Sequence, residues 1–235
     1  SLVVAFILLI ITSACAQTPK KMVFDGAAED RNLSGFTAIN LSNAFDVYIS
    51  QGTEDAVAVA ANDAAATKNI KTHITGGVLY ITFEQKGWGS WKNNKLKAYI
   101  TVKDLQKLTV SGACNVSFVD AITSNRLHIS TSGASDIKGS VNVSALKVGA
   151  SGASNISLSG KATDSDFNIS GACSIKSLNL VTENCTVVAS GASSVRLTIN
   201  QYLKANISGA SDIRYKGTVS RFETRTSGAS DIKPL

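Results

Sequence analysis

Ser151-Gly152-Ala153-Ser154-Asn155-Ile156 is one of seven copies of a single phrase in this chain of 235 residues. Each copy is Ser-Gly-Ala followed by a small residue, a small polar residue and Val or Ile, and successive copies lie 18 to 21 residues apart. A fixed glycine at this period predicts a solenoid, in which each repeat buries its apolar side chains only against its neighbours. The central glycines are Gly112, Gly133, Gly152, Gly171, Gly191, Gly209 and Gly228.

Alternation around each glycine indicates strands. A β-branched residue stands four positions after every copy of it, and the positions two and four before it are mostly apolar, with polar residues between them. A side-chain period of two is that of a half-buried strand. Glycine reaches backbone angles closed to other residues, and small neighbours let corners stack at the strand spacing of about 4.8 Å. The pattern therefore favours an all-β parallel β-helix of about seven coils; an antiparallel sandwich is the harder rival to exclude.

The chain divides into four segments. Residues 1–16 form an apolar run and exit typical of a secretory signal peptide, with Cys15 as a lipidation site if the leader is that of a lipoprotein. Residues 17–35 are polar and predicted to be flexible. Residues 36–110 are predicted to be a less regular β cap without the Ser-Gly-Ala corner, and residues 111–235 the repetitive β-helix. Within the cap we expect strands at 36–41, 45–50, 56–60, 70–74, 79–84 and 97–102, and a helical turn at 62–68.

Charge and cysteines limit the function. The formal net charge is +6, but the basic residues are scattered and no aromatic-interleaved basic stripe is present, which argues against nucleic-acid binding. The only membrane contact predicted is a lipid anchor. Cys114 and Cys173 lie three coils apart, about 14 Å, which is too far for a disulfide. Cys185 takes a place where other coils have Leu or Phe, so we expect buried free thiols in the rod. No CxxC pair or pair of histidines accompanies the cysteines, and no cofactor is predicted.

Two sets of residues are candidate sites. Trp88 and Trp91 share a loop with glycines and lysines, which could stack sugars; the alternative is a hairpin tip whose indoles fold back onto the cap. Asp212 and Asp231 are acids on adjacent coils and form the best pair for a metal such as calcium, although acids are missing from that place in four of the coils. Clustered catalytic acids of the kind that glycan hydrolysis needs are not evident.

The order of motifs resembles a known family. Phe36-x-x-Ile39, Phe45-Asp46-Val47-Tyr48-Ile49-Ser50-Gln51-Gly52, Gly77-Val78-Leu79-Tyr80-Ile81 and Leu105-x-x-Leu108-x-Val110-Ser111-Gly112, followed by Ser-Gly-Ala coils, look like the bacterial head GIN domain family (DUF2807) of auto-transporter adhesins. The resemblance covers about residues 36–233. It implies a right-handed parallel β-helix whose glycine corners join two sheets, a role in adhesion, and no catalytic residues to carry over.

The prediction is thus a non-catalytic, exported protein of the bacterial envelope (periplasm, outer membrane or cell surface) with an adhesin-like binding or scaffold role. Its expected partners are surface glycans or envelope components. The alternatives are a carbohydrate-active β-helix enzyme and a periplasmic structural or signalling accessory. The sequence does not predict the oligomeric state.

Overall fold

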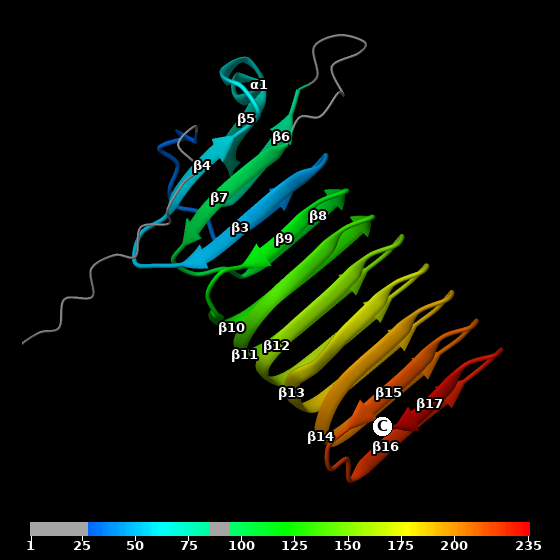
Figure 1. The fold of residues 1–235 in the computed structure, drawn as a ribbon. Helices are drawn as coiled ribbons and strands as arrows, with labels where there is room; N and C mark the ends of the chain where they lie inside the picture. Colours follow the sequence, from blue (N-terminus) through cyan, green and yellow to red (C-terminus); the bar gives the residue numbers. More distant parts are fainter. Residues whose placement is uncertain (1–27, 85–94) are drawn as a thin grey trace, which may run out of the picture.

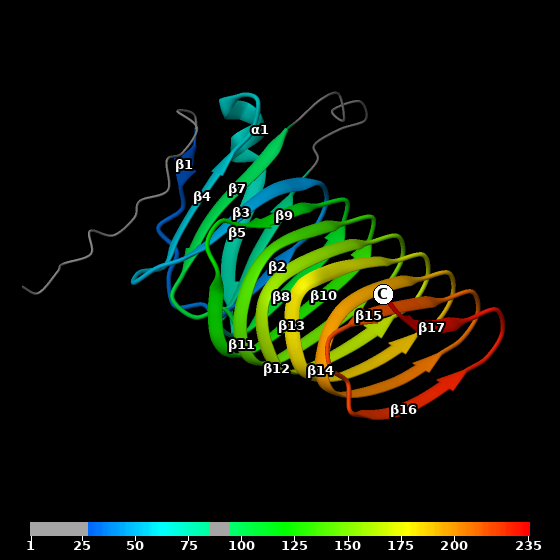
Figure 2. The ribbon, with the colours of Figure 1, turned by 60° about the horizontal axis from the view of Figure 1, so that its bottom comes forward.

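The computed structural model describes residues 28–84 and 95–235. They form one rod of stacked coils, closed at one end by short strands and a helix (Figures 1 and 2). The elements are β1 (Glu29–Asp30), β2 (Ala38–Leu41), β3 (Phe45–Gln51), β4 (Ala56–Ala60), α1 (Ala64–Lys68), β5 (Ile70–Thr75), β6 (Val78–Phe83), β7 (Leu96–Val102), β8 (Lys107–Gly112), β9 (Asn115–Phe118), β10 (Ile122–Gly133), β11 (Asp136–Ala150), β12 (Asn155–Ile169), β13 (Ser174–Ala189), β14 (Ser194–Ile207), β15 (Asp212–Lys216), β16 (Arg221–Thr226) and β17 (Asp231–Pro234).

Successive coils pair as parallel strands, so the predicted β-helix fold is confirmed. The strand segments before each corner form one face, here face A, with β6, β2, β8, the end of β10 and the ends of β11 to β14 in order, then β16. The segments after each corner form face B, with β7, β3, β9 and the starts of β11 to β14, then β15 and β17. A short third side closes each coil, where Ile122 pairs with Val141.

The core is a set of apolar rows that run along the rod between the two faces. On face B the residues four after each corner glycine are buried from Val116 to Ile213, and on face A Leu108, Ile129 and Val148 are fully buried in one such row. These are the positions that the period of two assigned to the interior. Burying continuous rows of Val, Ile and Leu is the main favourable contribution to folding in a solenoid, since each coil contacts only its neighbours.

Each corner glycine contacts the backbone of the corner before it. Gly152 has φ of 81°, and a Cβ atom on it would lie 2.5 Å from the carbonyl oxygen of Gly133. The same crowding recurs at the other corners. The N–H of Ala153 donates to this oxygen of Gly133 at 2.8 Å. The stack therefore requires glycine for two reasons, the left-handed backbone and the space taken up by the neighbouring coil.

Small polar residues fill the inside of the corner. Ser154, two residues after Gly152, is buried, and its hydroxyl donates to the carbonyl oxygens of Gly133 at 3.4 Å and Ser151 at 3.3 Å. Cys114 and Cys173 occupy the same position in their own coils. All three described cysteines, Cys114, Cys173 and Cys185, are free and buried, as predicted.

The β-helix begins earlier than the Ser-Gly-Ala phrase. Residues 36–110 lack the Ser-Gly-Ala phrase, but Ser42-Asn43-Ala44 forms the same kind of corner and joins β2 to β3. Asn43 has φ of 78°, and its carbonyl oxygen accepts the N–H of Ala113 at 2.8 Å, just as Gly133 accepts that of Ala153. Asparagine tolerates the left-handed region better than most residues, which lets it replace glycine at this corner.

The predicted cap strands are present, and they close the end of the rod beyond this first coil. On face A, β5 pairs antiparallel with β6; on face B, β4 pairs antiparallel with β7, and β1 with β4. The predicted helical turn is α1, whose first turn is capped by the carboxylate of Asp63, an acceptor for the N–H of Ala66 at 2.7 Å. Within residues 28–84 and 95–235, no helix is long and apolar enough to cross a membrane.

Candidate binding face of the β-helix

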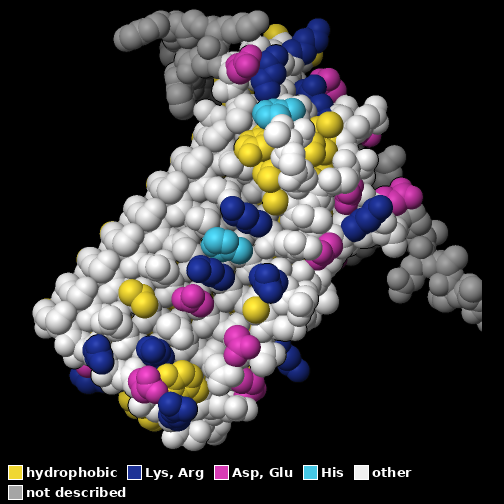
Figure 3. Space-filling view, turned by 180° about the vertical axis from the view of Figure 1, so that it is seen from behind, with side chains coloured by type: hydrophobic (Ala, Val, Ile, Leu, Met, Phe, Trp, Pro, Cys, Tyr) yellow, Lys and Arg dark blue, Asp and Glu magenta, His cyan; other side chains and the backbone are white. Residues whose placement is uncertain are grey.

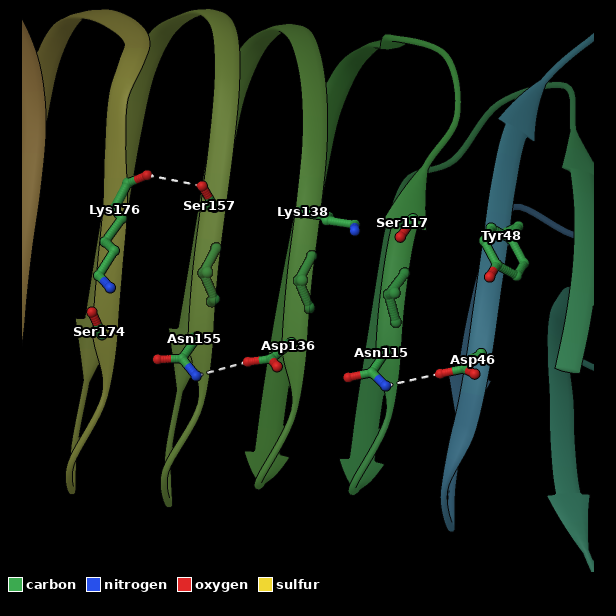
Figure 4. Close-up of a pocket in the computed structure, with 13 residues that line it drawn as sticks. Asp46, Tyr48, Asn115, Ser117, Asp136, Lys138, Asn155, Ser157, Ser174 and Lys176 are labelled. Atoms are coloured by element: carbon green, nitrogen blue, oxygen red, sulfur yellow. Dashed lines mark hydrogen bonds between the residues drawn. The ribbon is translucent and has the colours of Figure 1, made fainter. Parts of the chain in front are cut away.

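Face B carries two rows of polar side chains on its outside. The first, called here the acid–amide row, stands three residues after each corner. The amide nitrogen of Asn115 donates to Asp46 at 2.8 Å, and that of Asn155 donates to Asp136 at 2.7 Å (Figure 4). Acid and amide thus alternate over four coils, and each carboxylate is held by an amide from the coil that follows. The row is Asp46, Asn115, Asp136, Asn155, Ser174, Ser194, Asp212 and Asp231.

The second row, called here the cationic row, stands two residues further along each strand. It starts at Tyr48, whose ring stacks on that of Tyr99 in β7 with 5.3 Å between centroids and an interplanar angle of 14°. Basic residues then dominate towards the far end of the rod. The row is Tyr48, Ser117, Lys138, Ser157, Lys176, Arg196, Arg214 and Lys233.

Between these two rows lies a shallow open groove of about 450 Å³. It runs across β3, β9, β11, β12 and β13, so five successive strands supply its floor (Figure 4). Lys138 and Lys176 reach over it as donors, while Asp46 and Asp136 are acceptors. Because the strands are fixed at about 4.8 Å, the polar groups repeat along the groove at that interval. Such a surface suits an extended ligand with many hydroxyl or charged groups better than a small enclosed one.

The predicted acid pair Asp212 and Asp231 lies at the far end of the acid–amide row, and a cation already occupies the space between the two carboxylates. One guanidinium nitrogen of Arg214 lies 3.1 Å from Asp212, and the other lies 3.2 Å from Asp231. Lys233 approaches Asp231 at 2.7 Å, and the hydrogen bonds from Lys233 and then Arg214 lower the pKa of Asp231. A calcium ion at this pair would have to displace the Arg214 guanidinium. In the described part of the chain no group of three or more His, Cys, Asp or Glu side chains could hold a metal.

The remaining predicted site residues fall into two groups. Trp88, Trp91 and Cys15 lie outside the described residues. The seven corner glycines are all described and take part in the stacking of corners. They shape the rod without presenting a side chain to a ligand.

Face A is more mixed in charge. His128 stands in register with Lys107 on one side and Lys147 on the other, and Asp166 follows on the next coil. Burial, and then the two lysines, lower the pKa of His128. Figure 3 shows this face with both histidines, and Lys, Arg, Asp and Glu side chains are interspersed along it. His73 lies nearer the capped end and stacks on Tyr80 at 5.0 Å.

The sequence pattern indicated Asp212 and Asp231, at the far end of the acid–amide row, but it did not indicate the cationic row or Tyr48. The signal was available: reading five residues after each corner glycine gives Lys or Arg in five coils out of seven. Tyr48 could not be aligned with that row, because its coil has Asn43 in place of the corner glycine.

The fold is thus that of a β-solenoid, and face B gives it a long polar surface with an open groove instead of an enclosed pocket. The family model "Putative auto-transporter adhesin, head GIN domain" (DUF2807) matches residues 35–219, so the chain belongs to that family, as the motifs indicated. The comparison with curated proteins gave no match.

Solved structures share the fold. A "putative adhesin" from Bacteroides fragilis aligns with a TM-score of 0.77 and 20% identity, covering 88% of this chain and 96% of its own. A "putative lipid binding protein" from Parabacteroides distasonis has a TM-score of 0.67 and 19% identity, covering 90% and 98%. A "putative adhesin" from Parabacteroides merdae has a TM-score of 0.67 and 17% identity, covering 90% and 97%.

Proposed function

We propose that this chain is a non-catalytic, exported binding protein of the bacterial envelope, with an adhesin-like role. We propose further that it holds surface glycans or similar polar polymers along the groove of face B. The observation that supports this most is the groove itself, where lysines, carboxylates, amides and hydroxyls repeat at the spacing of the coils. Membership of an adhesin-named family supports the same role.

The chemistry of the groove suits a polyhydroxylated ligand. Lys138 and Lys176 offer charged donors for anionic or hydroxyl groups of a ligand. In the same row, Ser157 lies between the two lysines and Ser117 lies beside Lys138. Tyr48 ends the groove with an aromatic ring fixed by its stacking on Tyr99. An aromatic ring beside polar groups is a common platform for a sugar. A rigid β-helix keeps these groups in place before the ligand arrives, which reduces the entropy lost on binding.

The carbohydrate-active enzyme is the second candidate. Asp46 and Asp136 lie two coils apart, about 10 Å, near the upper end of the separations used by inverting glycosidases. Each of these carboxylates accepts a hydrogen bond from an asparagine of the next coil, so one oxygen of each is already engaged within the protein and not directed at a substrate. Binding therefore fits this arrangement better than hydrolysis.

Binding of glycans to the immobilised full chain tests the proposal. The Lys138→Ala/Lys176→Ala double variant should weaken binding at least about tenfold, as expected when two charged hydrogen bonds are lost. The matched control is Lys147→Ala/Lys204→Ala, which removes the same charge from face A, where both lysines are more than half exposed at 57%. The control should stay within about twofold.

Three outcomes separate the alternatives. Equal losses in both double variants would show that net charge, and not the groove, drives binding. Unchanged binding in Lys138→Ala/Lys176→Ala together with loss in Trp88→Ala/Trp91→Ala would move the site to the tryptophan loop. New reducing ends released from a bound glycan, and abolished by Asp136→Asn, would support the enzyme and overturn the binding role.

A further inference from the structure

The middle of face A carries four basic side chains on three neighbouring strands, called here the basic patch. Lys107 of β8, His128 of β10 and Lys147 of β11 stand in register, so each is about 4.8 Å from the next along the rod. Arg126 stands two residues before His128 in β10, so its side chain points to the same side of the sheet. The two lysines and Arg126 are exposed, and His128 is half-buried among them. Figure 3 shows a histidine between basic side chains in the middle of this face.

Most of the positive charge of the basic patch is uncompensated. In the part of the chain that the structure describes, none of Lys107, Arg126 and His128 forms an ion pair. Lys147 lies 4.0 Å from Asp166 of β12. With side-chain exposures of 57% and 49%, this pair contributes little and leaves the lysine accessible.

Two further carboxylates border the basic patch, and both are bonded to neutral donors. Asp104, in the loop before β8, accepts the Ser124 hydroxyl at 2.8 Å on one oxygen and the Gln106 amide at 2.6 Å on the other. Asp164 of β12 stands in the outward row of Arg126, two coils further along, and accepts the Asn184 amide at 2.9 Å. These acids therefore lie beside the patch without bridging its cations.

The arrangement favours an anion on electrostatic grounds. Like charges directly opposite each other on neighbouring strands destabilise a sheet, so the row from Lys107 to Lys147 carries a repulsion that a bound anion would relieve. Burial, and then these two lysines, lower the pKa of His128, which shows that its protonation is opposed by positive charge on both sides. Around this imidazole, a negative group would meet donors from three strands.

Among anions, a phosphate group matches these donors best. A phosphomonoester carries a charge of about −1.5 to −2 and three acceptor oxygens, against two for a carboxylate. The planar guanidinium of Arg126 can donate two parallel hydrogen bonds to such a group. The Cα atoms of Lys107 and Lys147 lie about 10 Å apart, so their long side chains can approach one group above His128 from opposite directions along the rod.

We propose that the basic patch of face A is a binding site for a phosphate group. Lys107 and Lys147 hold the phosphate from either side along the rod, while Arg126 and the imidazole of His128 donate to its oxygens. The site is distinct from the groove of face B, and it selects a different chemical group.

Nuclear magnetic resonance of the two histidines of the full chain tests the proposal. The imidazole C–H signals, assigned with His73→Gln and His128→Gln, are followed against pH in inorganic phosphate and in sodium chloride of equal ionic strength, which controls for screening. Phosphate should raise the pKa of His128, because a nearby negative charge favours the protonated imidazole. His73 lies four strands away along face A, about 19 Å, and its signal should respond equally to both salts. No added effect of phosphate at His128, or the same effect at His73, would overturn the site.

Paired lysine variants test which side chains hold the phosphate. Lys107→Ala/Lys147→Ala should raise the pKa of His128 in chloride, because two opposing charges are removed, and should raise the Kd for phosphate at least about tenfold. The control Lys161→Ala/Lys216→Ala removes the same charge from exposed positions on the third side and on face B. It should leave this Kd within about twofold. Equal weakening in both double variants would mean that net charge alone attracts phosphate, and would overturn the site.

The phosphate could belong to a lipid headgroup or to a water-soluble or polymeric ester, and vesicles distinguish these sources. Co-flotation of the full chain with phosphatidylcholine vesicles containing phosphatidic acid, lost in Lys107→Ala/Lys147→Ala, would assign a lipid headgroup. A response of His128 to inorganic phosphate without co-flotation would assign a non-lipid ester. The groove of face B is tested with glycans that carry no phosphate, for which Lys147→Ala/Lys204→Ala remains a control. The two sites therefore succeed or fail separately.

Discussion

Replacing the corner glycine Gly152 by alanine should destabilise the rod far more than an ordinary glycine substitution in a strand. The new Cβ atom would lie 2.5 Å from the carbonyl oxygen of Gly133 and 3.0 Å from its nitrogen. The backbone at Gly152, with φ of 81°, is also in the left-handed region, which costs a residue other than glycine about 1–2 kcal/mol.

The clash adds to that backbone cost. Relieving it means separating two coils at the point where the N–H of Ala153 bonds to Gly133 at 2.8 Å, and loss of a buried backbone hydrogen bond costs about 1–3 kcal/mol. Gly152→Ala should therefore lower the free energy of unfolding by about 2–5 kcal/mol. Urea denaturation followed by circular dichroism measures this value.

Two other glycines separate the contributions. Gly76 has φ of 58° but nothing within 4 Å of its added Cβ, so Gly76→Ala should cost only the left-handed strain, about 1–2 kcal/mol. Gly149 lies in a strand, and an added Cβ would be 3.8 Å from the Ser130 hydroxyl, an ordinary contact. Gly149→Ala should leave stability unchanged or raise it by up to ~1 kcal/mol. If Gly152→Ala costs no more than Gly76→Ala, the stacking explanation of the corner is wrong.

Three further predictions follow from single contacts. Asn43→Ala should lower the free energy of unfolding by about 1 kcal/mol more than Asn43→Gly does. Both variants lose the hydrogen bond that Asn43 accepts from the Phe83 N–H at 2.9 Å, but only alanine adds left-handed backbone strain at this position. Equal losses of stability would contradict the role of Asn43 as a corner residue. Cys114, Cys173 and Cys185 are buried, and burial raises the pKa of the Cys185 thiol to about 12. In a Cys15→Ser variant, iodoacetamide should therefore label these three thiols only in urea, and prompt labelling of any of them in the folded chain would refute their burial. Burial and the lysines lower the pKa of His128 in the folded chain. The contribution of neutral His128 to the free energy of unfolding is therefore fully present above the unfolded pKa of about 6.5, and it is lost as the pH falls through the folded value. His128→Gln should flatten this part of a stability–pH profile, and an unaltered slope would count against this role of His128.

The sequence was sufficient to predict the repetitive part of the fold because local sterics decide it. A glycine corner every 19 residues or so and a side-chain period of two depend on neighbours in the chain, and both are visible without tertiary structure. The cap strands from β2 to β7 and helix α1 were also predicted close to their observed bounds. The first corner was missed because Asn43 adopts the glycine conformation without being glycine.

The candidate site was less predictable, since it depends on contacts between coils. The placement of Arg214 between Asp212 and Asp231 arises from side chains on adjacent strands, and the sequence alone gave two neighbouring acids. The bonds from Asn115 to Asp46 and from Asn155 to Asp136 likewise join residues whose pairing requires the register. The groove lined by Lys138 and Lys176 also depends on the side-chain conformations of residues in neighbouring coils. The sequence therefore does not indicate which of the outward rows borders a groove.

Surface labelling of intact cells is the most direct test of the proposal that this rod binds partners from the bacterial envelope. An epitope inserted between Gly76 and Gly77 would sit at an exposed turn joining β5 to β6, where nothing lies within 4 Å of either added Cβ. If the rod is displayed on the cell surface, an antibody to the epitope should label intact cells as strongly as cells with a permeabilised outer membrane. Labelling that needs permeabilisation would place the rod in the periplasm and contradict an adhesin-like role.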